Sequence, residues 1–304
     1  MPKPPHRAGF VAIVGRPNVG KSTLLNRLMG QKLAIVSPKP QTTRGRILGV
    51  LNRPEAQIAF LDTPGLHTAK GGLNQRMVEQ ALQALADADV ALFLIEAGPP
   101  AIDAATRKAL DQVKTAGKPT LLVINKIDLL PRARLLPLID RWKDLHEWAD
   151  VYPLSALKGE NVGGLLDALI ARLPEGPALF PPEQWIDMQE RDLCAELIRE
   201  QLLRQTGQEV PYSAAVLVEQ FDESRREEVP RGLVRISATV LVERDSQKAI
   251  VIGKGGARLK EIGTRARQEI ERLLGAKVYL EVFVRVEPGW TRTAKGLRRA
   301  GYED

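Results

Sequence analysis

The feature that most restricts the fold of this chain is a glycine-rich turn near its start. An apolar run at residues 10–14 leads into GRPNVGKS at residues 15–22, and apolar residues then recur with helical spacing. This order matches the loop G-x-x-x-x-G-K-[ST], which needs a strand before it and a helix after it. Backbone N–H groups and the helix N-terminus of such a loop bind phosphate oxygens. The turn therefore predicts a nucleotide-phosphate site, with Lys21 on the β- and γ-phosphates and Ser22 on Mg²⁺.

Apolar runs alternate with helix-length amphipathic segments up to about residue 173. This alternation predicts an α/β domain with a mostly parallel six-stranded sheet and helices on both faces. The runs at 47–51 and 58–61 are joined by a short polar connection, which indicates one antiparallel edge strand. Four prolines at residues 174–182 then end the helical pattern. We expect a first domain at 1–174, a linker at 175–188 and a second domain at 189–304.

Two further motifs follow strand-like runs, where ligands of parallel sheets bind. DTPG at residues 62–65 ends the third run, so Asp62 is placed to hold Mg²⁺ through water and the Gly65 N–H to meet the γ-phosphate. NKID at residues 125–128 ends the fifth run. The Asp128 carboxylate can accept from N1–H and the exocyclic amine of guanine. Adenine has neither donor there, and an unpaired buried group costs about 1–3 kcal/mol. The motifs predict GTP and GDP as ligands.

The remaining contacts of this site follow from its neighbours. We expect Asn125 to tie its loop to the phosphate loop, Lys126 to cover the base and the Ala156 N–H to face guanine O6. The predicted nucleotide-binding residues are Gly15, Arg16, Pro17, Asn18, Val19, Gly20, Lys21, Ser22, Thr23, Asp62, Thr63, Pro64, Gly65, Asn125, Lys126, Asp128, Ser155, Ala156 and Leu157.

With these motifs, residues 8–173 resemble the translation-factor-related P-loop GTPases. The resemblance implies that a threonine of PQTTR at residues 40–44 closes over Mg²⁺ and the γ-phosphate; we expect Thr43, with Thr42 as the alternative. Leu66 stands where many such enzymes carry a water-orienting glutamine, which implies slow intrinsic hydrolysis. In members with asparagine at the position of Asn18, that residue is linked to a bound K⁺, so K⁺ is a candidate cofactor; a loop-bracing role is the alternative.

The predicted catalytic residues are Asn18, Lys21, Thr43, Asp62 and Gly65. The predicted Mg²⁺ ligands are Ser22, Thr43 and, through water, Asp62.

The C-terminal part points to a polyanion. Residues 244–299 carry 14 Lys and Arg against 6 Asp and Glu, and the chain as a whole has a net charge of +7. GKGG at residues 253–256 lies in the order helix–strand–strand–helix–loop–helix–strand, which resembles a type II KH domain. Such a loop clamps single-stranded RNA. The predicted RNA-binding residues are Gly253, Lys254, Gly255, Gly256, Arg258 and Lys260. A helix-start turn in an unrelated α+β domain is the alternative.

The tail at residues 288–302 places Trp290 and Tyr302 beside basic residues. Aromatic side chains in such a setting stack on bases or anchor the tail to its domain, and the sequence leaves both open.

A GTPase domain followed by a KH domain resembles the Era GTPases over nearly the whole chain. The resemblance implies a monomeric GTP-hydrolysing switch that binds 16S ribosomal RNA near its 3′ end and assists assembly of the 30S subunit, without a stable protein partner. Peripheral association with the inner membrane is reported for that family. The lone Cys194 and the lack of a leader-like or membrane-spanning run predict a cytoplasmic protein.

Two other functions remain open at this point. The first is a signalling or membrane-associated GTPase whose C-terminal module binds protein or lipid. The second is a GTPase for tRNA modification, which shares the loop asparagine and the apolar residue 66 but would call for a large N-terminal extension or a C-terminal catalytic cysteine.

Overall fold

A computed structural model of the chain describes residues 5–37, 39, 42, 47–65, 72–98, 102–207, 210, 214–227 and 232–300. These residues form two compact units. The first comprises Met1–Ala34, Thr43–Lys70 and Asn74–Asp187, and the second comprises Ile35–Thr42, Gly71–Leu73 and Met188–Asp304. The predicted boundaries at 174 and 188 stay a prediction.

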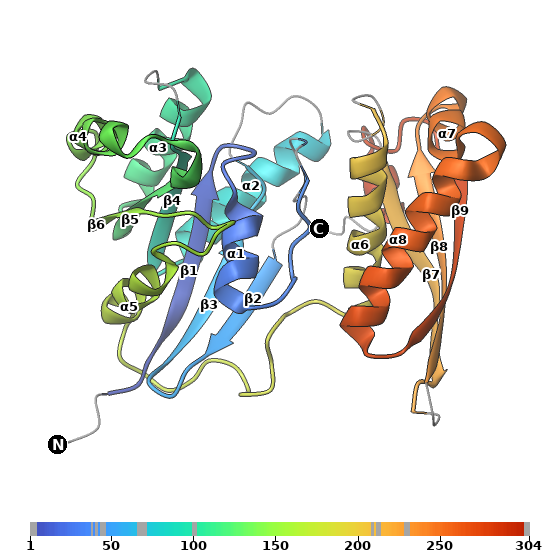
Figure 1. Ribbon diagram of the computed structural model, residues 1–304, viewed down its shortest axis with the longest axis horizontal. Coiled ribbons are helices and arrows are strands. Elements are labelled where there is room, and N and C mark those ends of the chain that lie inside the picture. Colours follow the sequence, from blue (N-terminus) through green and yellow to red (C-terminus); the bar gives the residue numbers. More distant parts are fainter. Residues whose placement is uncertain are drawn as a thin grey trace. The chain divides into compact units, whose positions relative to one another are not determined.

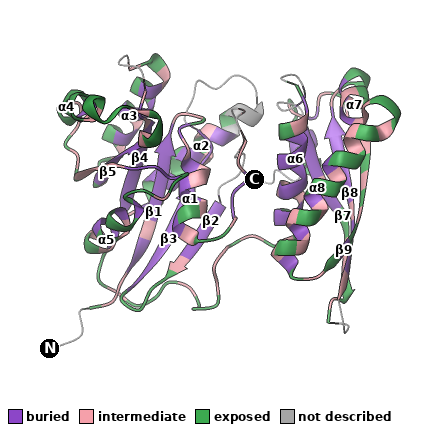
Figure 2. Cartoon of the chain, viewed as in Figure 1, coloured by how far each residue is buried: buried purple, intermediate pink, exposed green. Residues whose placement is uncertain are grey.

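The first unit is built on a six-stranded sheet in the order β2-β3-β1-β4-β5-β6 (Figure 1). Its strands are β1 (Arg7–Gly15), β2 (Ile47–Asn52), β3 (Ala56–Asp62), β4 (Val90–Glu96), β5 (Thr120–Asn125) and β6 (Asp150–Pro153). All neighbours pair in parallel except β2, which runs antiparallel to β3. The central strands are buried on both faces, which is why they appear in the sequence as continuous apolar runs (Figure 2). The predicted sheet and its antiparallel edge strand are confirmed.

Five α-helices of this unit are α1 (Lys21–Met29), α2 (Gly72–Asp87), α3 (Ala104–Ala116), α4 (Leu135–Lys143) and α5 (Val162–Arg172). One hydrophobic cluster joins α2, α3 and α4 to β1, β4 and β5, through residues such as Leu85, Phe93, Val113 and Leu138. Helices α1 and α5 lie on the other face of the sheet (Figure 1). Short 3₁₀ turns, η1 (Ile127–Leu129) and η2 (Arg132–Arg134), follow β5.

The proline-rich segment expected to be a linker packs against the first unit. It runs beside β2, where the Val50 N–H donates to the Trp185 carbonyl (2.9 Å) and the Asp187 N–H to the Leu48 carbonyl (3.1 Å). The Phe180 ring meets Phe10 edge-on, with ring centroids 6.0 Å apart. Prolines do not prevent this arrangement because only alternate residues of an edge segment need an N–H.

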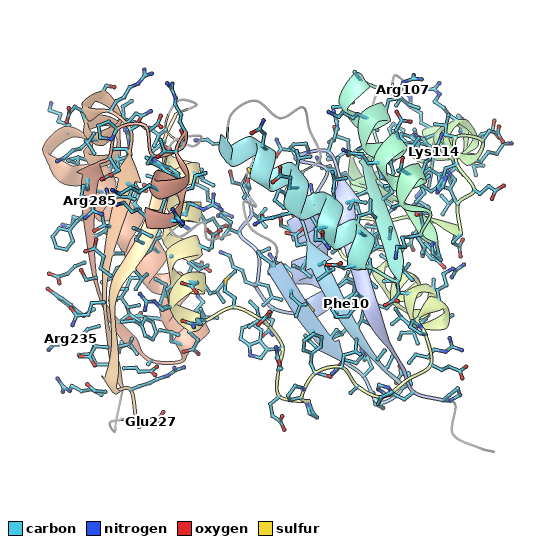
Figure 3. All side chains as sticks on the ribbon, turned by 180° about the vertical axis from the view of Figure 1, so that it is seen from behind. Phe10, Arg107, Lys114, Glu227, Arg235 and Arg285 are labelled. Atoms are coloured by element: carbon cyan, nitrogen blue, oxygen red, sulfur yellow. The ribbon has the colours of Figure 1, made fainter. Side chains whose placement is uncertain are left out.

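The second unit has a three-stranded sheet in the order β7-β8-β9, with β7–β8 antiparallel and β8–β9 parallel. Its elements are α6 (Glu190–Gln205), β7 (Ala215–Arg225), β8 (Leu233–Val242), α7 (Asp245–Ile252), η3 (Lys254–Gly256), α8 (Ala257–Leu274), β9 (Lys277–Val286) and α9 (Ala294–Arg299). Helices α6 and α8 share one apolar core with the sheet. This is the predicted type II KH arrangement. Arg235 and Arg285 project from the strands, where Tyr279 and Phe283 are also exposed (Figure 3).

The tail after β9 is anchored to its own domain. Trp290 is only 1% exposed, and the Thr291 hydroxyl donates to Glu243 Oε1 at 2.6 Å. Trp290 therefore takes the anchoring role of the two that the sequence left open; Tyr302 lies outside the described residues. In the part of the chain that the structure describes, no helix has the length and apolarity to span a membrane.

Candidate functional site

The phosphate loop connects β1 to α1 and turns its lysine back onto its own backbone. Lys21 Nζ donates to the carbonyls of Gly15 (3.3 Å) and Arg16 (3.2 Å). Burial lowers the pKa of Lys21 from its usual 10.5 to about 8, and the nearby Asp62 carboxylate partly offsets that effect. The site therefore holds a buried amine whose positive charge an anion would stabilise.

A candidate magnesium site lies where α1 begins and β3 ends. The Ser22 hydroxyl donates to Asp62 Oδ2 at 3.0 Å, and the Asp62 side chain is fully buried. A hydroxyl and a carboxylate are oxygen donors of the kind that Mg²⁺ takes. The described residues contain no cluster of three or more His, Cys, Asp or Glu that could hold a metal. The donor set thus fits an ion that also uses phosphate and water oxygens, as Mg²⁺ does at nucleotide sites.

Two glycines let three loops approach closely. Gly20 has φ +100°, and a Cβ there would lie 2.3 Å from Asn125 Nδ2. A Cβ on Gly65 would lie 2.7 Å from the backbone nitrogen of Pro17. Neither position tolerates a side chain without moving its neighbours, so the glycines of the first two motifs set the spacing of the loops.

Asn125 joins the loops at this edge of the sheet. Its Nδ2 donates to the Val19 carbonyl (2.8 Å), and its Oδ1 accepts from the N–H groups of Lys126 (2.8 Å) and Ala156 (3.0 Å). The first bond is the link expected from the sequence. The contact of the Ala156 N–H with guanine O6 stays a prediction; in this structure that N–H donates to Asn125 Oδ1. Asp128 lies in η1 and is exposed.

The glycine loop of the second unit lies between α7 and α8. Gly255 and Gly256 have φ values of +58° and +78°, and a Cβ on either would meet nothing within 4 Å. Lys254 is exposed beside them, whereas Arg258 Nη1 donates to the Ile250 carbonyl at the end of α7. The loop thus presents bare backbone and one lysine, and Arg258 uses part of its donor capacity within the fold.

A groove of about 400 Å³ continues from this loop between α8 and β9. Its lining residues are Gly256, Leu259, Lys260, Gly263, Thr264, Arg267, Leu280 and Val282. Other basic residues of α8 form ion pairs along the helix, such as Arg265 with Glu261 (2.7 Å) and Arg272 with Glu269 (2.5 Å). The groove combines an apolar floor with a basic rim.

Comparison with known proteins covers the chain almost completely. A family described as 50S ribosome-binding GTPases matches residues 10–126, and the KH domain family matches residues 209–291. GTPase Era of Syntrophus aciditrophicus is 48% identical over 98% of this chain and 96% of its own length; that of Geobacter metallireducens is 49% identical over 98% of both. The chain belongs to the Era family of GTPases.

Two solved Era structures have the same fold as this chain. A crystal structure of Era in complex with MgGDPNP and nucleotides 1506–1542 of 16S ribosomal RNA shares 45% identity, with a TM-score of 0.92 over 98% of this chain and all of that one. A tyrosine-to-alanine variant of Aquifex aeolicus Era bound to GDP·AlF₄⁻ gives the same identity, coverage and TM-score.

The structure adds a charge network to this Era-family site that the motifs did not reveal. Glu96, the last residue of β4, pairs with Arg16 and, at 2.6 Å, with Lys126 Nζ. Lys126 Nζ also donates to the Asn18 carbonyl (2.7 Å), and Arg16 pairs with Asp103 (2.7 Å). Glu96 ends a strand at the same edge as the motifs, and that position was the available signal.

Arg27 of α1 was also missed. Its Nε donates to the Ala156 carbonyl (3.1 Å) and its Nη2 to the Leu157 carbonyl (2.5 Å). In the sequence this residue is one more charge on an amphipathic helix, and no motif marks it. It braces the loop that follows β6.

Thr43 and Leu66 lie outside the described part of the chain. Thr42 is described, and its hydroxyl donates to the Lys39 carbonyl at 2.7 Å. Asn18 adopts φ +66°, which is uncommon for a residue with a side chain and is tolerated best by asparagine and aspartate.

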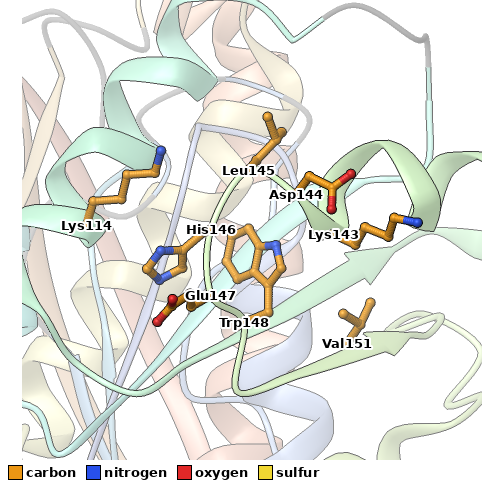
Figure 4. Close-up of a pocket in the computed structure, with 8 residues that line it drawn as sticks. All are labelled: Lys114, Lys143, Asp144, Leu145, His146, Glu147, Trp148 and Val151. Atoms are coloured by element: carbon orange, nitrogen blue, oxygen red, sulfur yellow. The ribbon is translucent and has the colours of Figure 1, made fainter.

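The first unit also has a pocket of about 600 Å³. It lies at the amino ends of β5 and β6, away from the motifs (Figure 4). The Trp148 ring forms one wall and stacks on Phe93, with ring centroids 5.8 Å apart, while Trp142 is buried beside them. Lys143 at its rim pairs with Asp140 (2.6 Å). The two tryptophans therefore pack against Phe93 in the core.

Proposed function

We propose that this Era-family GTPase is a GTP-dependent switch that binds 16S ribosomal RNA near its 3′ end and assists assembly of the 30S subunit. The observation that carries the proposal is the full-length likeness to an Era structure holding both MgGDPNP and nucleotides 1506–1542 of that RNA. The 50S-binding description belongs to a family match that ends at residue 126, so it does not address the RNA-binding half.

Within the first unit, the contacts described above support specific roles. Lys21, already buried in the loop, neutralises the β- and γ-phosphates, and the Gly65 N–H meets the γ-phosphate. Ser22 and, through water, Asp62 hold Mg²⁺, which when bound offsets the charge of the β- and γ-phosphates. Asp128, exposed in η1 just after β5, accepts from guanine, and Asn125 keeps that loop against the phosphate loop.

Slow turnover is part of this proposal. A leucine at position 66 cannot hydrogen-bond a water, so hydrolysis depends on other groups. We assign Thr43 to Mg²⁺ and the γ-phosphate, and Asn18 to a bound K⁺ that supplies positive charge. GTP turnover in KCl, compared with NaCl at equal ionic strength, tests the K⁺ role; equal rates would remove it.

The second unit supplies the RNA contacts. Gly253, Gly255 and Gly256 let the backbone approach a sugar-phosphate chain, and Lys254 and Lys260 add charge. The test is binding of an RNA of nucleotides 1506–1542 to the full chain, measured by fluorescence anisotropy. The double variant K254D/G255D should bind at least tenfold more weakly, and the control K108D, an exposed charge reversal on α3, should not.

If K254D/G255D bound this RNA as tightly as the unaltered chain, the alternative of a protein- or lipid-binding module would be favoured. A monomeric state and peripheral association with the inner membrane remain predictions from the family resemblance. Sedimentation and flotation with anionic vesicles test them.

Coupling between nucleotide and RNA has a physical route. We expect GTP to order residues 38–46 and the segment after Gly65. The stretch Ile35–Thr42, which overlaps the first of these, belongs to the second unit. Arg204 of α6 donates to the Val36 carbonyl (3.1 Å), and Lys39 Nζ to the Gly207 carbonyl (3.1 Å). Ordering that loop therefore acts on α6. RNA affinity should differ between the GDPNP and GDP forms; equal affinities would exclude coupling.

A further inference from the structure

Gly263 occupies a position in α8 where the fold itself gives no reason for glycine. It lies in the middle of an 18-residue helix with ordinary helical backbone angles. A Cβ built there would meet only Val282 Cγ2, at 3.9 Å, which is ordinary van der Waals contact. Glycine is the least favourable residue after proline in a helix interior, so alanine would fit and would stabilise the helix.

The place of Gly263 in the groove gives a reason. The α8 residues that line the groove, together with the glycine before them, are Gly256, Leu259, Lys260, Gly263, Thr264 and Arg267, which form one stripe along the helix. Gly263 is at the centre of that stripe, opposite Leu280 and Val282 of β9. At the centre of the groove, the side formed by α8 therefore presents the backbone of Gly263 and no side chain.

The chemistry of the groove suits a nucleobase. Leu259, Leu280 and Val282 are partly buried apolar side chains, which suit the flat face of a base. Arg267, held by Glu271 at 3.0 Å, and the exposed Lys260 supply positive charge at the rim, where the sugar-phosphate chain would run. The glycine loop lies at one end of the same stripe.

We propose that Gly263 leaves room in the groove for one base of the bound RNA, and that this base lies against the α8 backbone. We call this base-binding position the seat; Gly263 is then a specificity-determining residue of the groove. The proposal rests on the RNA-binding function above. It implies that the chain gives up helix stability at this position in return for the depth of the groove.

The test uses the full chain with substitutions G263A and G263L and an RNA of nucleotides 1506–1542. We expect G263A to unfold at the same temperature or higher, yet to bind this RNA about tenfold more weakly, and G263L to bind more weakly still. The matched control is G163A in α5, where a Cβ would meet nothing within 4 Å; it should leave RNA affinity unchanged.

Abasic substitutions scanned along the RNA locate the seat. With the unaltered chain, one position should lose affinity when its base is removed; with G263A, the same removal should cost much less, because the seat is already obstructed. If G263A and the unaltered chain bind the RNA equally, the proposal is wrong, whatever the behaviour of G263L.

The two sets of variants distinguish the RNA-binding function of this domain from the base-binding position at Gly263. If K254D/G255D and G263A both leave RNA affinity unchanged, the RNA-binding assignment of this domain is wrong. If K254D/G255D weakens binding and G263A does not, only the seat is wrong.

Discussion

The two sites of this chain differ in how far their polar groups are already engaged. In the nucleotide site, Lys21 makes hydrogen bonds within its own loop, and Ser22 and Asn125 make them to neighbouring segments. In the proposed RNA site, Lys254 is exposed and a Cβ on Gly255 would meet only open space. The first site is preorganised by contacts between loops, and the second presents free backbone to its ligand. Substitutions should therefore act cooperatively in the first and locally in the second.

The largest effect is expected from N125A. It removes the partner of the Val19 carbonyl and of the Lys126 and Ala156 N–H groups, and each buried group left unpaired costs about 1–3 kcal/mol. GTP affinity, measured by titration calorimetry, should fall at least about a hundredfold. Q83A is the control, because Gln83 of α2 makes an exposed bond to Asp87 Oδ1 (2.8 Å) and should change little. A loss confined to tenfold would mean that the loops hold their positions without this residue.

Alkaline pH should weaken GTP binding through the Lys21 amine of the nucleotide site. The pKa of Lys21 is lowered to about 8 by burial, so above pH 8 the free protein carries a neutral amine there. Binding of an anionic nucleotide favours the charged amine and takes up a proton. GTP affinity should therefore fall as pH rises from 8 to 10, by at most about tenfold per pH unit. A flat profile over that range would show that the amine stays charged without nucleotide.

The same lowered pKa of Lys21 should make the nucleotide-free protein more stable as pH rises, whereas GTP affinity falls. Between pH 8 and the unfolded value of 10.5, the unfolded chain keeps the Lys21 proton and the folded chain loses it. The free energy of unfolding of the nucleotide-free protein should therefore increase as pH rises through this window. Denaturant titrations of the unaltered chain and K21M should diverge there; parallel curves would contradict this assignment.

A smaller effect is expected from K254Q. One exposed lysine that neutralises one phosphate should change the slope of log affinity against log salt by about one, without altering GTP affinity. Anisotropy titrations from low to moderate salt measure the slope. An effect on GTP binding would show that the two sites are less separate than their contacts indicate.

The smallest effect is expected from R27M, which keeps an unbranched apolar stem but loses the guanidinium and both of its bonds to the loop after β6. Two net hydrogen bonds of about 1 kcal/mol or less each, partly replaced by water, correspond to about a fivefold loss of GDP affinity. R107M, on the exposed side of α3, is the matched control. If R27M binds GDP normally, the loop holds its place through Asn125 alone.

The sequence predicted the sheet, its antiparallel edge and both glycine loops because each depends on local spacing. Alternating runs require a parallel sheet, and motifs after strands meet at one edge. Arg27 and Glu96 were not predicted, because a single charged residue carries no sign of which carbonyl or cation it will reach. The bond from the Ala156 N–H to Asn125 Oδ1 was not predicted either, because the sequence does not show which backbone groups a side-chain amide will reach.

The proline-rich segment shows a different limit. Prolines mark the end of a helix, and the sequence therefore indicated a free linker. The pairing with β2 depends on the carbonyl of Trp185 and the N–H of Asp187, which any residue type can supply. Gly263 was likewise not singled out, because only the groove shows what its missing side chain leaves open.

The pairing beside β2 has a consequence for dissecting this protein. Trp185 and Asp187 occupy backbone groups that an outer strand would otherwise offer to another molecule. A fragment cut after residue 174 would leave that row of donors and acceptors bare, and copies of it would pair through their strands and precipitate. A fragment carried to residue 187 keeps its own cover and should stay dispersed, so the usable end of the GTPase domain lies beyond its last helix.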